Sequence, residues 1–290
     1  MTVTSGAVLL DKPADITSFA VLSSVKRAFD TRRVGHTGTL DRFATGLMVV
    51  LVGKATRLAT AATNQDKSYL FDIVFGSETD TLDPTGEVVA EGPIPERSDV
   101  EGILGRFTGD LVQVPPAYSA VHVDGRRASQ LARSGQTPTL EARNVHIAEL
   151  TLTSMEGRVA RMEASCSKGT YIRSLARDIA RELGTVAHVG RLRRTRVGAF
   201  NVSEANLPDA VGRDDLMAPD EFLKRLGGVG FARLKASMVE RIRHGVPLEE
   251  GHFTGGMPEE SVIAVRDPAG RVVAVVEWRH GRLEYRVVFS

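Results

Sequence analysis

The sequence GHTGTLDRFATGLMVVLVGKATR, residues 35–57, contains both a clear strand pattern and a candidate reactive side chain. Its second half is an unbroken apolar run, Leu47–Val52, between Gly46 and Gly53. An apolar run of this length between glycines is typical of a strand that is buried on both faces. Its first half is a glycine-rich loop with one carboxylate, Asp41, and loops carried on rigid strands often hold reactive groups. The pattern predicts a buried strand that positions Asp41, and a turn-capping role for Asp41 is the alternative.

Composition indicates an ordinary globular protein. The chain has 290 residues, of which 42% are hydrophobic and 25% charged, with a formal net charge of +1. This is enough for one large core and a smaller domain. No apolar run is long enough to cross a bilayer and no signal peptide is recognisable, so we expect a cytoplasmic protein. A single cysteine, Cys166, excludes an internal disulfide, and the histidines lack metal-binding spacing, so we expect no metal and no cofactor.

Basic residues are concentrated between positions 168 and 196. This segment carries eight Lys and Arg residues against two acidic ones. A basic stripe on a nearly neutral chain is typical of a surface that binds a polyanion.

Periodic patterns predict further elements. Tyr69, Phe71, Ile73 and Phe75 alternate with other residues, which indicates one buried face of a strand. Strands are also expected at 7–11 and 159–167, and helices at 19–29 and 100–107. From composition alone Tyr69 is a core residue.

A helix is predicted from Tyr171 to Gly184, because apolar residues recur there at helical spacing and glycine ends the pattern. Arg173 lies in its first turn, where the helix N-terminus is already positive. This placement indicates a specific anionic partner, and Asp41 is the candidate.

Several motifs resemble the TruB family of tRNA pseudouridine synthases. They occur in the order that the family has them: LLDKP with TS at 9–18, GHTGTLD and ATGL at 35–47, GKATR at 53–57, KSY at 67–69, TDTLDPTG at 79–86, KGTYIR at 168–173 and AHVGRLRRTRVG at 187–198. Two positions depart from the pattern. Arg42 stands where the family often has proline, and Ser129 where it often has an aromatic residue.

The resemblance implies an α+β fold with a mixed, largely antiparallel central sheet flanked by helices and loops. A small C-terminal β-rich module, similar to the RNA-binding PUA type, is expected to follow. We place the domains at 1–228 and 229–290. The helix expected at 234–243 and the strands expected at 261–265, 272–278 and 283–289 belong to the second.

The activity implied is isomerisation of a uridine in the T-arm loop of tRNA, at position 55, to pseudouridine. The chain would work as a monomer, without a protein partner or membrane. The catalytic residues by resemblance are Asp41, Tyr69, Tyr171 and Arg173, with Tyr69 stacking on the flipped base. RNA contacts are expected from His36, Leu192, Arg126, Arg127, Arg133, Lys168, Arg177, Arg181 and Arg194. Residues 113–135 are expected to form a long basic loop that closes over RNA; a solvated loop is the alternative.

Three questions stay open at this level. Asp41 could attack C1′, add to C6 or remove a ribose proton. The chain could instead be a non-catalytic RNA-binding or folding factor that uses the same surface. It could also be a glycosidic hydrolase, which would need a second carboxylate such as Asp80 or Asp83.

Overall fold

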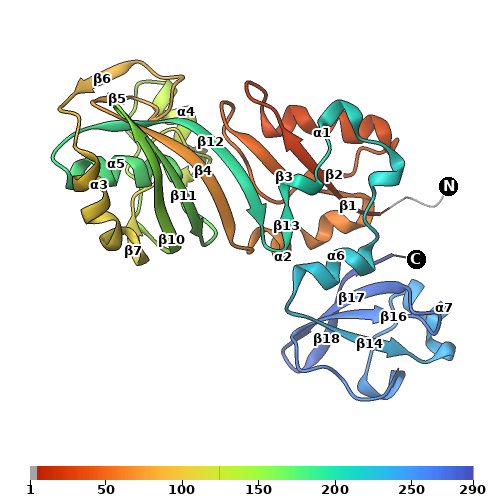
Figure 1. Cartoon of the computed structure of the whole chain (residues 1–290). Helices are drawn as coiled ribbons and strands as arrows, with labels where there is room; N and C mark the ends of the chain where they lie inside the picture. The colour runs from red at the N-terminus through yellow and green to blue at the C-terminus, as the bar shows by residue number, and fades with distance from the viewer. Residues whose placement is uncertain (1–4, 124, 290) are drawn as a thin grey trace.

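A mixed nine-stranded sheet dominates the computed structural model, which describes residues 5–123 and 125–289 (Figure 1). Its main path is β1 (Gly6–Lys12), β3 (Thr45–Val52), β12 (Ala187–Val197), β4 (Lys67–Phe75), β11 (Val159–Cys166), β10 (Arg143–Glu156) and β7 (Gly109–Gln113). The short strands β2 (Val34–His36) and β13 (Phe200–Asn201) pair with β3 and β12. Among these described strands, β3 and β12 form the one parallel pair. The predicted mixed, largely antiparallel sheet is confirmed.

The predicted strand at 47–52 is buried on both faces, as expected. Met48, Val50 and Val52 face one hydrophobic core, whereas Leu47, Val49 and Leu51 face another. Close packing also explains the glycine that precedes it. Gly46 has φ +105°, and a Cβ at this position would lie 2.2 Å from the carbonyl oxygen of Arg194 on β12. A side chain there would therefore push the parallel strands apart.

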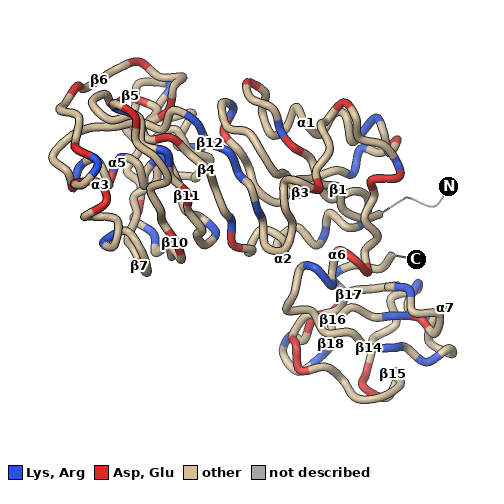
Figure 2. Tube along the Cα trace, in the orientation of Figure 1, with Lys and Arg blue, Asp and Glu red and all other residues tan. Residues whose placement is uncertain are grey.

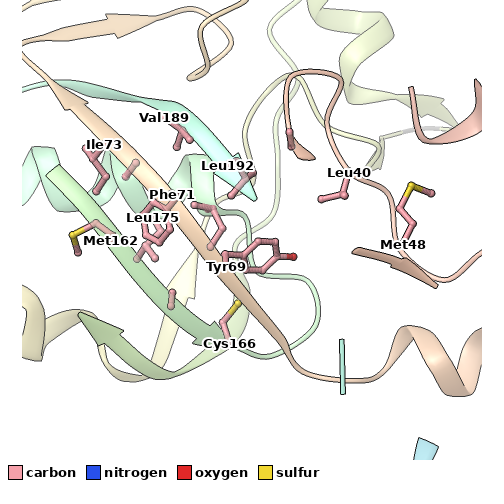
Figure 3. Packing of buried hydrophobic residues seen from close by; sticks show 14 of the residues in the cluster. Leu40, Met48, Tyr69, Phe71, Ile73, Met162, Cys166, Leu175, Val189 and Leu192 are labelled. Carbon is pink, nitrogen blue, oxygen red and sulfur yellow. The ribbon is translucent and has the colours of Figure 1, made fainter. Parts of the chain in front are cut away.

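The other half of the sheet is covered by α5 (Ile172–Glu182). The alternating side chains of β4 pack with Leu175 and Ile179 of this helix, and Met162 of β11 belongs to the same core. Figure 3 shows Tyr69 leaving β4 within this core, with its hydroxyl directed towards Leu40 and Met48.

Four further helices of the described chain accompany the large sheet. They are α1 (Ser18–Ala28), α2 (Ala59–Thr63), α3 (Arg97–Ile103) and α6 (Pro219–Leu226), whereas α7 (Val239–Arg243) packs in the C-terminal module (Figure 1). Thr17 caps α1 by accepting a hydrogen bond from the Ala20 amide, so this predicted helix is confirmed. The hairpin of β5 (Ser77–Thr79) and β6 (Val88–Glu91) follows β4. No helix in the described part of the chain is long and apolar enough to span a membrane.

The expectation that residues 113–135 form one long loop is wrong. The segment contains a small hairpin, β8 (His122–Val123) and β9 (Arg126–Arg127), followed by α4 (Ala128–Arg133). The six residues of α4 are too few to show a helical period, and the prolines and glycines around them dominated the interpretation. We call residues 113–135 the arm.

The C-terminal sheet has five described strands in the order β15 (Phe253–Thr254), β14 (Val229–Leu234), β16 (Val262–Arg266), β17 (Val272–Arg279) and β18 (Arg282–Val288). The expected β-rich module is confirmed. The helix expected at 234–243 was placed too early, because Leu234 ends β14 and α7 begins at Val239. The domain limit at residue 228 stays a prediction. Apolar residues of this sheet share one core with Leu47 and Phe222.

Candidate active site

The loop that carries Asp41 is held from two sides by buried hydrogen bonds. The Ser18 hydroxyl donates to the Leu40 carbonyl at 2.9 Å and accepts from the Leu40 amide at 2.8 Å. The buried guanidinium of Arg194 donates to the carbonyls of Gly38 at 3.0 Å and Thr39 at 3.3 Å. The backbone on the N-terminal side of Asp41 is therefore fixed to α1 and to β12.

Lys12 supports the loop on the other side of Asp41. Its ammonium is fully buried and donates to the carbonyls of Pro13, Ile16 and Arg42, at 2.8, 2.9 and 3.1 Å. Burial lowers the pKa of Lys12 to about 8, although the negative charges of Asp15 and Asp41 act in the opposite direction. The bonds to three carbonyls give this lysine a structural function in the loop.

Asp41 and Arg173 form the predicted ion pair. The Arg173 Nη2 donates to Oδ1 of Asp41 at 3.0 Å, and Nε lies 2.9 Å from Oδ2. The Arg173 side chain is only 4% exposed, whereas that of Asp41 is 35% exposed. The guanidinium is therefore fixed within the protein, and the carboxylate remains open to a ligand. A two-point contact of this kind also sets the plane of the carboxylate.

The same guanidinium binds three further groups. Its Nη1 donates to the Thr81 carbonyl at 2.8 Å and to Oδ2 of Asp83 at 3.2 Å, and its Nη2 donates to the Tyr118 carbonyl at 2.9 Å. From the sequence alone, Asp83 is expected only as a possible second carboxylate of a hydrolase. The motif that could have shown its importance is TDTLDPTG, which contains it.

Asp83 does not fit the second carboxylate of a hydrolase. It is buried, and its Oδ1 accepts hydrogen bonds from Thr81 and Thr85. Oδ2 accepts from Arg173, so both oxygens of this buried group are occupied by protein partners and not by a substrate. Asp83 is thus a fixed negative group that shares Arg173 with Asp41.

Three charges determine the protonation of Asp41. Burial raises the pKa of its carboxyl above the usual range of an aspartate, and the adjacent Arg173 is the largest influence in the opposite direction. The negative charge of Asp83 adds to the rise, and Lys12 opposes it. The predicted pairing with Arg173 therefore favours the ionised form, but burial makes Asp41 more basic than an exposed aspartate.

Two tyrosines flank this pair, and both have a raised pKa because they are buried. Tyr69 is 8% exposed and packs in the same core as Leu192 and Leu40. Tyr171 caps α5, and its backbone amide donates to Oε1 of Gln113 at 2.8 Å. Both hydroxyls therefore stay neutral at physiological pH and can serve as hydrogen-bond donors.

Helix α5 also holds the base of the arm. The Val114 carbonyl accepts hydrogen bonds from the Ser174 hydroxyl at 2.8 Å and from Nη2 of Arg177 at 3.0 Å. The Arg177 side chain is only 10% exposed and also contacts Asp178. Direct RNA contact was expected from Arg177 and Arg194, but the structure buries both in hydrogen bonds to protein. They support the arm and the Asp41 loop instead.

Other predicted RNA contacts lie at the surface. Arg126, Arg127, Arg133, Lys168 and Arg181 are exposed, and Figure 2 shows further basic positions along β12. His36 is half-buried in β2, and burial together with Arg194 lowers its pKa. The imidazole is therefore neutral near pH 7. The described residues contain no group of three or more His, Cys, Asp or Glu side chains that could hold a metal ion.

Comparison with protein families adds an independent finding. The model described as TruB family pseudouridylate synthase (N terminal domain) matches residues 26–172. The model described as tRNA pseudouridylate synthase B C-terminal domain matches residues 173–221.

Similar proteins and structures agree with these matches. A tRNA pseudouridine synthase B from Bordetella avium is 44% identical over 210 residues, which cover 71% of this chain and 86% of that protein. The protein of the same name from Novosphingobium aromaticivorans is 42% identical over 269 residues, with 86% and 88% covered. Among solved structures, a Cbf5-Nop10-Gar1 complex matches with a TM-score of 0.74 at 23% identity, covering 100% of this chain and 86% of that one. The last likeness supports the fold alone.

Proposed function

Because this chain belongs to the TruB family of pseudouridylate synthases, we propose that it is an isomerase that converts a uridine of tRNA to pseudouridine. The observation that carries the proposal is the ion pair of Asp41 and Arg173, in which the carboxylate is partly exposed and held on both oxygens. Relatives whose sequences match most of this chain are named tRNA pseudouridine synthase B.

The reaction breaks the bond between N1 of uracil and C1′ of ribose, turns the base and joins C5 to C1′, while C5 loses a proton and N1 gains one. No electrons are gained or lost, so the residues must supply positioning, charge and proton transfer. The base must leave its stack to reach the site, which costs a few kcal/mol. Stacking on Tyr69 would return about 1–3 kcal/mol of this cost.

We assign the catalytic contact with the nucleotide to Asp41, whose basicity is increased by burial. Arg173 would fix its orientation, and the neutral hydroxyl of Tyr171 would donate a hydrogen bond near the carboxylate or the base. Attack at C1′, addition at C6 and removal of a ribose proton all remain compatible with this arrangement. His36, Leu192 and the exposed basic residues of the arm and α5 would contact the RNA around the target.

The proposal also covers the target uridine, the oligomeric state and the cellular location. We infer that the target is position 55 in the T-arm loop, which is the uridine that the resemblance of the sequence motifs to the TruB family implies. We also infer that one chain is sufficient, because Asp41, Tyr69, Tyr171 and Arg173 all come from the same chain. Action in the cytoplasm follows from the proposed tRNA substrate.

The test is to map pseudouridine in transcribed tRNA after incubation with the purified protein. We expect one modified uridine in the T-arm loop. Asp41→Asn should form no product while it still binds tRNA, and Asp214→Asn, an exposed aspartate, should behave as the wild type. Binding without product by the wild type would instead indicate a non-catalytic RNA-binding factor, and release of free uracil would indicate a hydrolase.

A further inference from the structure

Phe19 is an aromatic side chain that the fold leaves uncovered. It is 69% exposed, and no other aromatic residue is among the large exposed hydrophobic side chains of the described chain. It is the second residue of α1, and Nζ of Lys26 lies 4.8 Å from the centre of its ring. One side of the ring is thus associated with a cation, and a planar ligand would use the other.

Arg42 is an exposed cation in a fixed position beside Asp41. Its Nε donates to the Asp15 carbonyl at 2.9 Å, and its own carbonyl accepts from the Asp15 amide at 2.9 Å. No described carboxylate forms an ion pair with it, and its terminal nitrogens have no hydrogen-bonding partner among the described residues. The charge is therefore available to an anion from outside the protein.

Both residues are sequence neighbours of residues that form or hold the Asp41 loop. Phe19 follows Ser18, which is bonded to both backbone groups of Leu40. Arg42 follows Asp41 and is bonded to Asp15, three residues before Ser18. The same two segments thus carry an exposed aromatic ring next to Ser18, which fixes the Asp41 loop, and an exposed guanidinium next to Asp41 in sequence.

The charge around these residues indicates what kind of partner fits. In positions 15–33, Lys26, Arg27, Arg32 and Arg33 outnumber Asp15 and Asp30. Proteins bind unpaired nucleotides by stacking the base on an aromatic ring and by pairing the phosphate with arginine. A protein partner would be expected to need a larger apolar patch than one phenylalanine in a segment with an excess of basic residues.

We propose that Phe19 and Arg42 form a nucleotide-binding surface for an unpaired residue of the RNA that flanks the target uridine. Its base stacks on the open face of Phe19, and a backbone phosphate on the same strand pairs with Arg42. This inference rests on the proposed function, because it takes an RNA substrate as given. It adds a contact outside the candidate active site, which would hold the strand while the target base is flipped.

The stacking contact is tested with a fluorescently labelled T-arm stem-loop RNA. Phe19→Ala should raise Kd about 5- to 100-fold, in the range of a lost base stack. Phe19→Trp should keep Kd close to that of the wild type, whereas Phe19→Leu, which is apolar but not aromatic, should lose most of the affinity. Val89→Ala removes an equally exposed apolar side chain from β6 and should change Kd less than twofold.

The phosphate contact is tested by the salt dependence of Kd. Arg42→Gln should reduce the slope of log K against log salt concentration by about 0.7, the value for one contact with single-stranded nucleic acid. Arg42→Lys should retain the slope. Thermal unfolding of each variant should match the wild type, because both side chains are exposed.

Three results would overturn the inference. They are an unchanged Kd for Phe19→Ala, a full rescue by Phe19→Leu, and an unchanged salt slope for Arg42→Gln. These failures differ from failure of the proposed function. If the wild type forms pseudouridine and Phe19→Ala does so with the same KM, the surface is refuted and the activity stands. If the wild type binds RNA without product, the Kd series still decides the surface.

Discussion

Replacing Arg173 with lysine tests the central contact of the site most directly. The change keeps the positive charge but removes the planar guanidinium. In the wild type this group contacts both oxygens of Asp41, one oxygen of Asp83 and the carbonyls of Thr81 and Tyr118. An ammonium has three donors on one nitrogen and cannot make the two-point contact with a carboxylate. At least two of the five contacts must therefore be lost.

The expected loss follows from the burial of these groups. A hydrogen bond to a charged group is worth about 1.5–3 kcal/mol, and leaving a buried partner unsatisfied has a similar cost. Because part of the charge interaction survives in the lysine variant, we expect the free energy of unfolding to fall by about 2–4 kcal/mol. A shift of the carboxylate by about 1 Å would lower the rate roughly 100-fold. The expected fall in kcat is therefore at least about 100-fold.

The assay is single-turnover pseudouridine formation at saturating enzyme, together with urea unfolding of the same samples. Arg97→Lys is the matched control, because it makes the same exchange at an exposed arginine of α3 that has no assigned RNA contact. It should change the rate less than twofold and the free energy of unfolding by less than about 0.5 kcal/mol. If Arg173→Lys keeps the wild-type rate, the geometry of the guanidinium is not required and the reasoning fails.

Three further predictions concern the loop, the pH dependence and the shared core. Ser18→Ala leaves two buried backbone groups of the Asp41 loop without a partner, so it should lower the free energy of unfolding by about 2–4 kcal/mol in urea titration. The control Ser24→Ala removes only a hydrogen bond within α1 and should lower it by less than about 1 kcal/mol. Burial raises the pKa of Asp41, and the proposed active form is the ionised one, so turnover should decline with falling pH at a value above about 4. Asp83→Asn removes a negative charge and should move this decline to lower pH; a profile that Asp83→Asn leaves in place would contradict the charge assignment. Phe222→Ala should lower the free energy of unfolding by about 3–5 kcal/mol, because this fully buried ring joins α6 to the core that the two sheets share. A loss below about 1 kcal/mol would show that the shared core does not stabilise the chain.

Much of the sheet could be predicted because its signals are local. The run at 47–52 has no polar residue because both of its faces are covered, and β4 alternates because α5 covers one face only. The pairing of Asp41 with Arg173 could also be inferred, because an arginine in the first turn of a helix needs an anion. In each case the residue types within a short stretch of sequence are enough to predict whether the stretch is buried or charged.

The sequence was less informative where a residue depends on distant partners. Arg177 and Arg194 read as surface charges, and only the fold shows that they are buried against carbonyls of the arm and the Asp41 loop. Strand β14 was missed because glycines precede it and its pairing partner, β16, lies almost thirty residues later. Short elements such as α4 were hidden because six residues contain less than two turns.

Arg173 connects three segments that are far apart along the chain: the Asp41 loop, the loop at 79–86 and the arm. A planar guanidinium cannot turn towards one partner without weakening its contacts with the others, so the position of the arm and the orientation of Asp41 depend on each other. The pair leaves the carboxylate accessible, because the Asp41 side chain is 35% exposed while the Arg173 side chain is only 4% exposed. The proposed contact with a nucleotide can therefore form while Arg173 still holds the carboxylate, whether Asp41 attacks C1′, adds to C6 or removes a ribose proton.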